Sequence, residues 1–175
     1  MLSDCNFTDS FLATYRLEGP NFEDTNHRVL KMWNTFFAYP EPNMTTFPSH
    51  NTELVILTNH ETWGFCPHHL LPVKYTMNIG YYPSERVVGI SKLARVANYV
   101  LRSLPLQEDI PLLIIEKLEG ALKPKGCGVV VKGEHLCMRI RGVQSAEGVI
   151  TTRAFTGTFL SDETAREYML CKEGR

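Results

Sequence analysis

The strongest constraint on the fold is the alternating run "VKYTMNIGYY" at residues 73–82. Side chains of a β-strand point alternately to its two faces, so an apolar residue at every second position is typical of a strand with one buried face. The apolar positions of this run are Val73, Tyr75, Met77, Ile79 and Tyr81. The run therefore predicts a strand.

The other elements follow from periodicity and from flanking residues. Strands are expected at residues 53–59, 128–132, 134–143 and 149–159. Helices are expected to begin at the N-cap residues Asp24, Ser91 and Asp109, and a last short helix near Asp162. Because the middle helices are grouped rather than alternating with single strands, this order predicts an α+β domain with an antiparallel sheet.

The length of the chain favours a single domain. The chain has 175 residues, 43% of them apolar, which suffices for one packed core and is short for two. Residues 1–23 show no sustained periodicity and contain the breakers Gly19 and Pro20, so we expect a loosely ordered N-terminal lead-in there. The domain itself is expected to span residues 24–175.

The net charge argues against general binding to nucleic acid or membranes, and the cysteine pattern indicates the cellular compartment. The net charge is -1, from 18 basic and 19 acidic residues, so no global field would attract nucleic acid or an anionic membrane. The sequence has neither an apolar stretch of membrane-spanning length nor a secretory start. Its five cysteines are scattered, which favours free thiols in a reducing compartment and hence a cytoplasmic protein.

Two segments combine cysteine with histidine. In "FCPHHLLPV" at residues 65–73, Cys66 and His69 are three positions apart and can reach one ion from a tight loop. In "EHLCMRIRGV" at residues 134–143, the strand period would put His135 and Cys137 on one face, together with Arg139 and Arg141. Cys137 is thus a candidate third ligand, and three ligands leave a fourth zinc position open, as in catalytic zinc sites. The alternative is a small buried cysteine beside surface histidines.

Basic residues recur as pairs three positions apart. Lys92 and Arg95 follow Ser91 in the first turn of an expected helix, where free backbone amides favour an anion. Arg28 and Lys31 repeat the spacing, and Arg141 is a further candidate for binding a phosphate-rich ligand. Solvated helix faces are the alternative interpretation of each pair.

One carboxylate lies at a break between two helices. Glu108 in "LQEDIP" can accept two parallel hydrogen bonds from a planar N–H donor edge, such as that of guanine, or it can cap the following helix.

Four ordered motifs resemble the GTP cyclohydrolase I family. They are "CPHHLLP", "GISKLAR", "LQED" and "HLCMRIRGV", and "DTNHRVLKM" and "ITTRAFTGTF" are similar to its entry and closing segments. The resemblance covers residues 24–159. It implies the tunnelling fold (T-fold), an antiparallel sheet with helices on one face whose subunits associate into a barrel. It further implies a homodecamer of two pentamers with active sites between subunits.

The resemblance also implies a reaction and roles for individual residues. GTP and water would give 7,8-dihydroneopterin triphosphate and formate, the first step toward pterins and folate or toward 7-deazaguanine compounds. Zn²⁺ would be held by Cys66, His69 and Cys137, and the catalytic histidines would be His68 and His135. Substrate contacts would come from Glu108 and Gln107 at the guanine and from Ser91, Lys92, Arg95, Arg141, Arg28 and Lys31 around the triphosphate.

Two departures from the family pattern keep alternatives open. Pro67 stands where the family usually has glutamate, which removes a carboxylate and a backbone donor and stiffens the loop. Asn26 replaces the proline of the entry motif. The alternatives are a purine nucleotide hydrolase that stops at ring opening or uses another nucleotide, and a non-catalytic zinc-stabilised GTP-binding assembly protein. Retention of His68 and His135 favours the complete reaction, and retention of these two residues and Glu108 argues against the non-catalytic protein.

Overall fold

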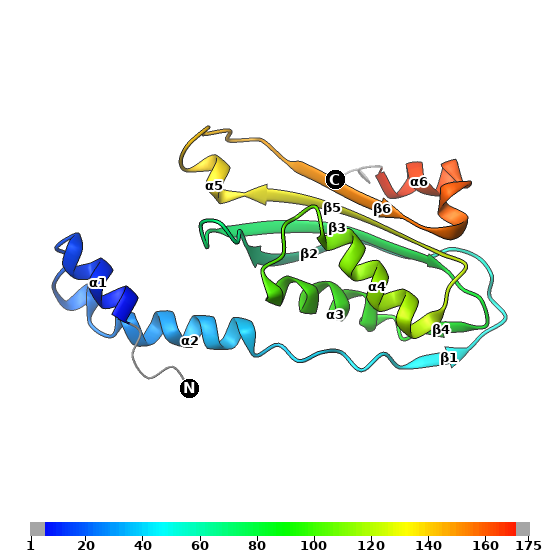
Figure 1. Cartoon of the computed structure of the whole chain (residues 1–175), viewed down its shortest axis with the longest axis horizontal. Helices are drawn as coiled ribbons and strands as arrows, with labels where there is room; N and C mark the ends of the chain where they lie inside the picture. Colours follow the sequence, from blue (N-terminus) through cyan, green and yellow to red (C-terminus); the bar gives the residue numbers. More distant parts are fainter. Residues whose placement is uncertain (1–5, 171–175) are drawn as a thin grey trace. The chain divides into compact units, whose positions relative to one another are not determined.

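The structure, a computed structural model, describes residues 6–170 and divides the chain into two compact units, Met1–Tyr39 and Pro40–Arg175 (Figure 1). Within the described part of the chain, no helix has the length and apolar character that crossing a membrane requires.

The smaller unit is helical. It contains α1 (Asn6–Thr14), the 3₁₀ turn η1 (Pro20–Phe22) and α2 (Thr25–Phe37). Helix α1 lies in the segment expected to be loosely ordered. Phe11 of α1 packs against Tyr15, the residue that directly follows the helix, with the two rings 4.8 Å apart. A single short aromatic stripe of this kind stabilises a helix without producing a long periodic pattern.

The larger unit is built on a four-stranded antiparallel sheet in the order β2-β3-β5-β6. Its strands are β2 (Val55–Phe65), β3 (Pro72–Tyr82), β5 (Gly126–His135) and β6 (Ile150–Phe155). A separate antiparallel pair is formed by β1 (Thr46–Pro48) and β4 (Arg86–Val88). The remaining elements are α3 (Ser91–Val100), η2 (Leu101–Ser103), α4 (Ile110–Leu122), α5 (Leu136–Arg139), η3 (Gly157–Leu160) and α6 (Glu163–Leu170).

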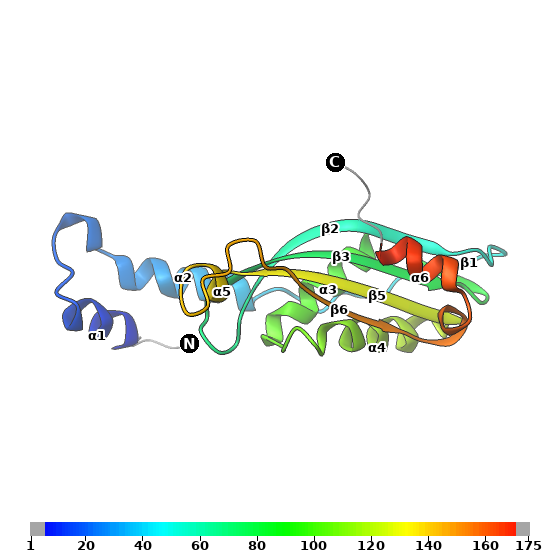
Figure 2. The same cartoon turned by 90° about the horizontal axis from the view of Figure 1, so that it is seen from above.

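The core lies between the sheet and helices α3 and α4. The alternation predicted for β3 is confirmed, because its five apolar positions are all buried in one cluster with residues of both helices, among them Val96, Ile114 and Leu118. Val130 of β5 points to the opposite face, where it packs with Phe159 and Met169. Helices α3 and α4 thus cover one face and α6 part of the other (Figure 2). The expected α+β fold with an antiparallel sheet is confirmed.

One predicted strand is wrong. Strand β5 ends at His135, and residues 136–139 form the short helix α5. The pairing of β3 with β5 runs from Tyr82 opposite Gly126 to Val73 opposite His135. Beyond that pair β3 offers no further partner except Pro72, which has no backbone N–H to donate. The alternating pattern of residues 134–143 therefore has no neighbouring strand to pair with, and the chain turns into a helix.

Strand β2 is longer than predicted and contains an irregularity. The prediction ended at Asn59, whereas β2 continues to Phe65 after a shift of register between Leu57 and His60. Asn59 has a φ of 53°, and its backbone N–H donates to Oδ1 of Asn78 at 2.8 Å. The side chain of Asn78 thereby compensates for the backbone pairing that the bulge interrupts.

The helix starts are close to the predicted ones, and Asp24 and Asp109 occupy the predicted N-cap positions, but the predicted N-cap residues do not act as side-chain caps. Asp24 and Asp109 precede α2 and α4, and Ser91 is the first residue of α3, yet none of the three makes a side-chain capping hydrogen bond. Asp24 has a φ of 59°, which turns it away from capping geometry. Asp162 does cap α6, because its Oδ1 accepts the backbone N–H of Ala165 at 2.9 Å.

Candidate functional site

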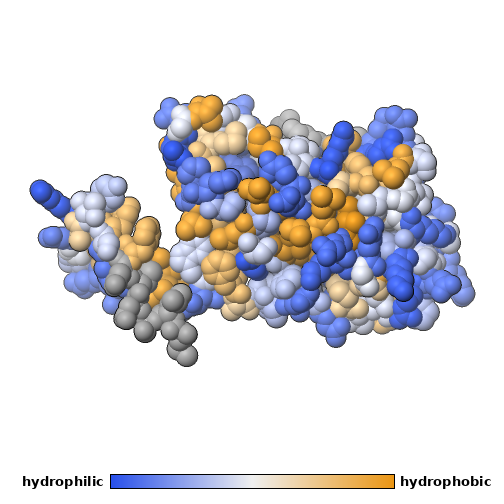
Figure 3. All heavy atoms as spheres, in the orientation of Figure 1, coloured by the Kyte–Doolittle hydropathy of each residue, from blue (hydrophilic) through white to orange (hydrophobic). Residues whose placement is uncertain are grey.

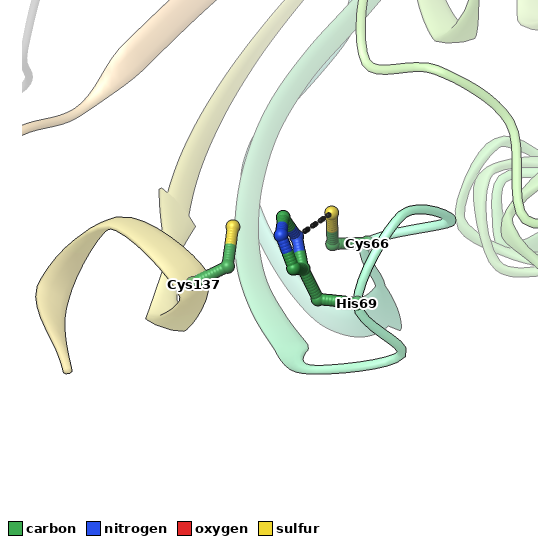
Figure 4. Close-up of side chains that lie close together, drawn as sticks. All are labelled: Cys66, His69 and Cys137. Carbon is green, nitrogen blue, oxygen red and sulfur yellow. Dashed lines mark hydrogen bonds between the residues drawn. The ribbon is translucent and has the colours of Figure 1, made fainter. Parts of the chain in front are cut away.

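A tight loop between β2 and β3 presents two candidate ligands. The backbone N–H of Cys66 donates to the carbonyl of Leu71 at 2.9 Å, and the N–H of Leu70 donates back to the carbonyl of Cys66 at 2.8 Å. Pro67 occupies the second position of this turn, where its fixed φ is favoured and no N–H is needed. The closed loop holds Sγ of Cys66 3.6 Å from Nδ1 of His69 (Figure 4).

The third candidate ligand comes from α5. Ligand atoms of Cys66, His69 and Cys137 all lie within 4.8 Å of one another. The predicted trio is therefore brought together, although Cys137 reaches the site from a helix rather than from a strand face. Arg139, expected beside it, instead forms an ion pair with Glu134 at 2.7 Å.

The donor set fits a zinc ion. From zinc bond lengths of about 2.0–2.3 Å, ligand pairs in a tetrahedral site lie about 3.6–3.8 Å apart, so small side-chain rotations would complete the geometry. Burial raises the pKa of the Cys137 thiol and the adjacent Cys66 raises it further, whereas Arg141 lowers it. Because zinc binds thiolates, its affinity here should increase with pH.

One cavity collects most of the predicted site residues. Its volume is about 260 Å³. It is lined by the predicted residues Cys66, His68, His69, Gln107, Glu108, His135 and Cys137. Tyr75, which the sequence assigned to the core, also lines it. The cavity is thus a concave site with the candidate metal ligands on its wall and several groups able to move protons or to donate and accept hydrogen bonds.

His135 is the last residue of β5 and lines the cavity together with the Cys66–His69 loop and Glu108. Its Nε2 is 2.6 Å from Oε1 of Gln107, and the Tyr75 ring meets its imidazole edge to face at 6.2 Å. Burial lowers the pKa of His135, and the Glu108 carboxylate partly opposes this. The imidazole is therefore mainly neutral at pH 7 and available as a base.

Glu108 and Gln107 are adjacent in sequence but differ in environment. Glu108 is exposed at the cavity wall. Gln107 is only 5% exposed, and its Nε2 donates to the carbonyl of Ile150 at 2.8 Å. The sequence did not reveal that the Gln107 amide is engaged by the protein; the only signal was a polar residue next to a helix start.

Comparison with known proteins identifies the family. The family model for GTP cyclohydrolase I matches residues 15–173. The chain belongs to the GTP cyclohydrolase I family. A protein named GTP cyclohydrolase 1 from Sulfurihydrogenibium sp. is 40% identical over 158 residues, which cover 87% of this chain and 84% of the relative. The protein of that name from Wolinella succinogenes is 38% identical over 150 residues, covering 82% and 80%.

A solved structure is also similar. The apo crystal structure of the archaeosine synthase QueF-Like matches 59% of this chain and 93% of its own length, with 19% identity and a TM-score of 0.46. The family prediction made from the motifs is confirmed by the family model and by the relatives, as is the expectation of an enzyme of this family. The T-fold of GTP cyclohydrolase I agrees with the antiparallel α+β architecture.

The basic residues of the family motifs are not among those lining the cavity. Ser91 and Lys92 lie in the first turn of α3 and Arg95 in the second. Arg141 follows α5 and is close enough to lower the pKa of Cys137. Arg28 belongs to the smaller unit, where its Nη2 donates to the carbonyl of Glu23 at 2.5 Å and to Oγ1 of Thr25 at 3.1 Å. Lys31 is exposed on the same helix, α2.

Proposed function

We propose that this member of the GTP cyclohydrolase I family converts GTP and water to 7,8-dihydroneopterin triphosphate and formate, using zinc held by Cys66, His69 and Cys137. The observation that carries the proposal is the convergence of this ligand trio with His68, His135 and Glu108 around one cavity. The names of the relatives support the same activity. Bound zinc would supply Lewis-acid activation of water at neutral pH.

Guanine binding and the proton transfers would be carried out by different side chains of the cavity. Glu108 is exposed to the cavity and would accept hydrogen bonds from the guanine N–H edge, which orients C8 toward the metal loop. His68 lies next to the ligand residues, with Nδ1 3.8 Å from Sγ of Cys66, and would protonate the imidazole ring of the purine as it opens. His135, neutral by burial, would exchange protons with the ribose during rearrangement and ring closure.

The triphosphate would be bound by basic residues from more than one subunit. The N–H of Val88 in β4 donates to the hydroxyl of Tyr81 at 3.0 Å, so the start of α3 lies near the Tyr81 end of β3. The cavity lies near Val73, about 27 Å away along the strand at 3.4 Å per residue. We therefore expect the start of α3 to contact the triphosphate bound in the cavity of a neighbouring subunit, through Ser91, Lys92 and Arg95. We assign three further basic residues to triphosphate binding: Arg28, Lys31 and Arg141.

Exposed apolar residues support an assembly. Figure 3 shows apolar patches on the larger unit near the start of α4. Side chains such as Leu112 and Ile140 are 58% and 62% exposed. Surfaces of this kind mark interaction sites. We infer a barrel-forming homo-oligomer, of the decameric kind implied by the sequence, with substrate sites between subunits.

The product would enter pterin and folate or 7-deazaguanine synthesis in the cytoplasm. Among the described cysteines, Cys66, Cys127 and Cys137 are free thiols, which fits a reducing compartment.

The test is to incubate zinc-loaded protein with GTP while measuring formate release and the fluorescence of the oxidised pterin. Both signals are expected. The variant Glu108→Gln should raise KM for GTP strongly, whereas the neighbouring Asp109→Asn serves as the matched control and should behave as the parent. Formate without pterin would reduce the activity to ring opening, and GTP binding without either product would indicate a non-catalytic protein.

A further inference from the structure

The side-chain amide of Gln107 has a fixed orientation. Its Nε2 lies 2.8 Å from the carbonyl oxygen of Ile150 and 3.4 Å from that of Val131, and both are acceptors only. The amide nitrogen must therefore face these carbonyls, because the amide oxygen cannot donate. This leaves Oε1 directed at Nε2 of His135, 2.6 Å away.

This orientation determines which nitrogen of His135 carries hydrogen. An amide oxygen can only accept, so a hydrogen bond of this length requires the hydrogen on Nε2 of His135. In the neutral ring Nδ1 is then the nitrogen with a free lone pair. We propose that Gln107 is a positioning residue that holds His135 as the Nε2–H tautomer, so that Nδ1 is the atom that exchanges protons with the substrate.

The fold makes room for this amide and anchors it. At Gly133 on β5, an added Cβ would lie 2.2 Å from Oε1 and 3.0 Å from Cδ of Gln107, so only glycine leaves space for the amide. The Thr152 hydroxyl donates to the backbone carbonyl of Gln107 at 3.1 Å, which fixes the main chain as well. With 5% exposure, the Gln107 side chain is shielded from water that would compete for these bonds.

The proton transfers balance with this tautomer. A substrate group gives its proton to Nδ1 of neutral His135, which becomes an imidazolium with hydrogen on both nitrogens. Nε2 keeps its hydrogen bond to Gln107 throughout, and Nδ1 later returns the proton. Gln107 thus restrains the rotation of the ring and its tautomer but contributes no proton. This assignment rests on the proposed function for its catalytic meaning, and it differs from the guanine-binding role that the resemblance implies for Gln107.

The first test measures the tautomer directly and does not depend on activity. Solid-state ¹⁵N NMR of protein labelled at histidine, minus the spectrum of His135→Ala, gives the two ring nitrogens of His135. We expect hydrogen on Nε2 in the parent and a mixture of tautomers in Gln107→Leu. Hydrogen on Nδ1 in the parent would overturn the proposal even if the protein is an active cyclohydrolase. If the parent makes no pterin, the proposed function fails while the tautomer result stands.

The second test separates positioning from substrate binding. Removing a hydrogen-bond partner that orients a metal-ligating histidine typically costs about 10- to 100-fold in activity. We expect a loss of the same order in kcat for Gln107→Leu, with KM for GTP nearly unchanged. Gly133→Ala should have the same effect by displacing the amide without altering any reacting group. Gly120→Ala is the matched control, because an added Cβ there meets nothing within 4 Å. Unchanged kcat in both variants, or a rise in KM alone, would refute the positioning role.

Discussion

Replacement of Asn78 by leucine should destabilise the larger unit through the loss of two hydrogen bonds. Asn78 is 6% exposed on β3. Its Oδ1 accepts the N–H of Asn59 in the β2 bulge at 2.8 Å, and its Nδ2 donates to the carbonyl of Met169 in α6 at 2.7 Å. Leucine is similar in size but can form neither bond, so the two backbone groups lose their partner.

The magnitude follows from the environment of those groups. The bond to Met169 is buried, so leaving its carbonyl unpaired costs about 1–3 kcal/mol. The bond to Asn59 is part-buried, so water can partly replace Asn78 as the acceptor for the Asn59 N–H. The cost of losing this bond is therefore limited to about 0.5–1.5 kcal/mol. The sum predicts a loss of about 1.5–4.5 kcal/mol of unfolding free energy.

The assay is urea unfolding at a fixed protein and zinc concentration, since the proposed oligomerisation and zinc binding would both add to the apparent stability. Asn43→Leu is the control, because Asn43 is exposed and a surface change of this kind usually stays within about 0.5 kcal/mol. If Asn78→Leu loses no more unfolding free energy than Asn43→Leu, the two hydrogen bonds of the Asn78 side chain do not stabilise the β2 bulge and α6, and the reasoning is refuted.

Three further predictions concern the site and the C-terminal helix. Cys137→Ala should lose zinc, whereas His135→Ala should retain it and form no pterin; equal zinc content by elemental analysis would remove Cys137 from the ligand set. Pro67→Ala should make the unbound loop more flexible and so reduce the free energy of zinc binding by about 0.4–1 kcal/mol, which chelator competition would show as an affinity weakened about 2- to 5-fold. Unchanged affinity would contradict the role of the proline. The Tyr82 hydroxyl donates to Asp162 at 2.6 Å and, with the helix cap, lowers the pKa of that carboxyl, so its stabilisation is present above the unfolded pKa of about 3.9 and is lost as the pH falls. Asp162→Asn should therefore lower Tm at pH 7, and its difference from the parent should narrow below about pH 4; a constant difference across pH would argue against the ionised form.

Elements with long, regular patterns were predictable from the sequence. The alternation of residues 73–82 gives β3 because one face of that strand is buried over its whole length. The trio of candidate metal ligands was predictable because thiol and imidazole are chemically distinctive and lie in two short motifs. Neither conclusion required knowing which strands are neighbours.

Features that depend on neighbours were not predictable. The pattern of residues 134–143 alternates, yet α5 forms there because no strand lies beside it, and a four-residue helix is too short to show a helical period. The role of Gln107 is a second example. Its burial depends on the absence of a side chain at Gly133, and the sequence alone does not bring those two positions together.

The end of one strand explains why the site forms where it does. Pro72 pairs with Phe65 of β2, and the next residue, Val73, pairs with His135 of β5, so both pairings stop at the same end of β3. Proline cannot donate a further ladder hydrogen bond, and this frees the chain on both sides to leave the sheet. On one side it forms the loop with Cys66, and on the other the helix with Cys137. The ligands thus converge because their two strands end against the same two residues of β3, and a register slip of either strand would separate them.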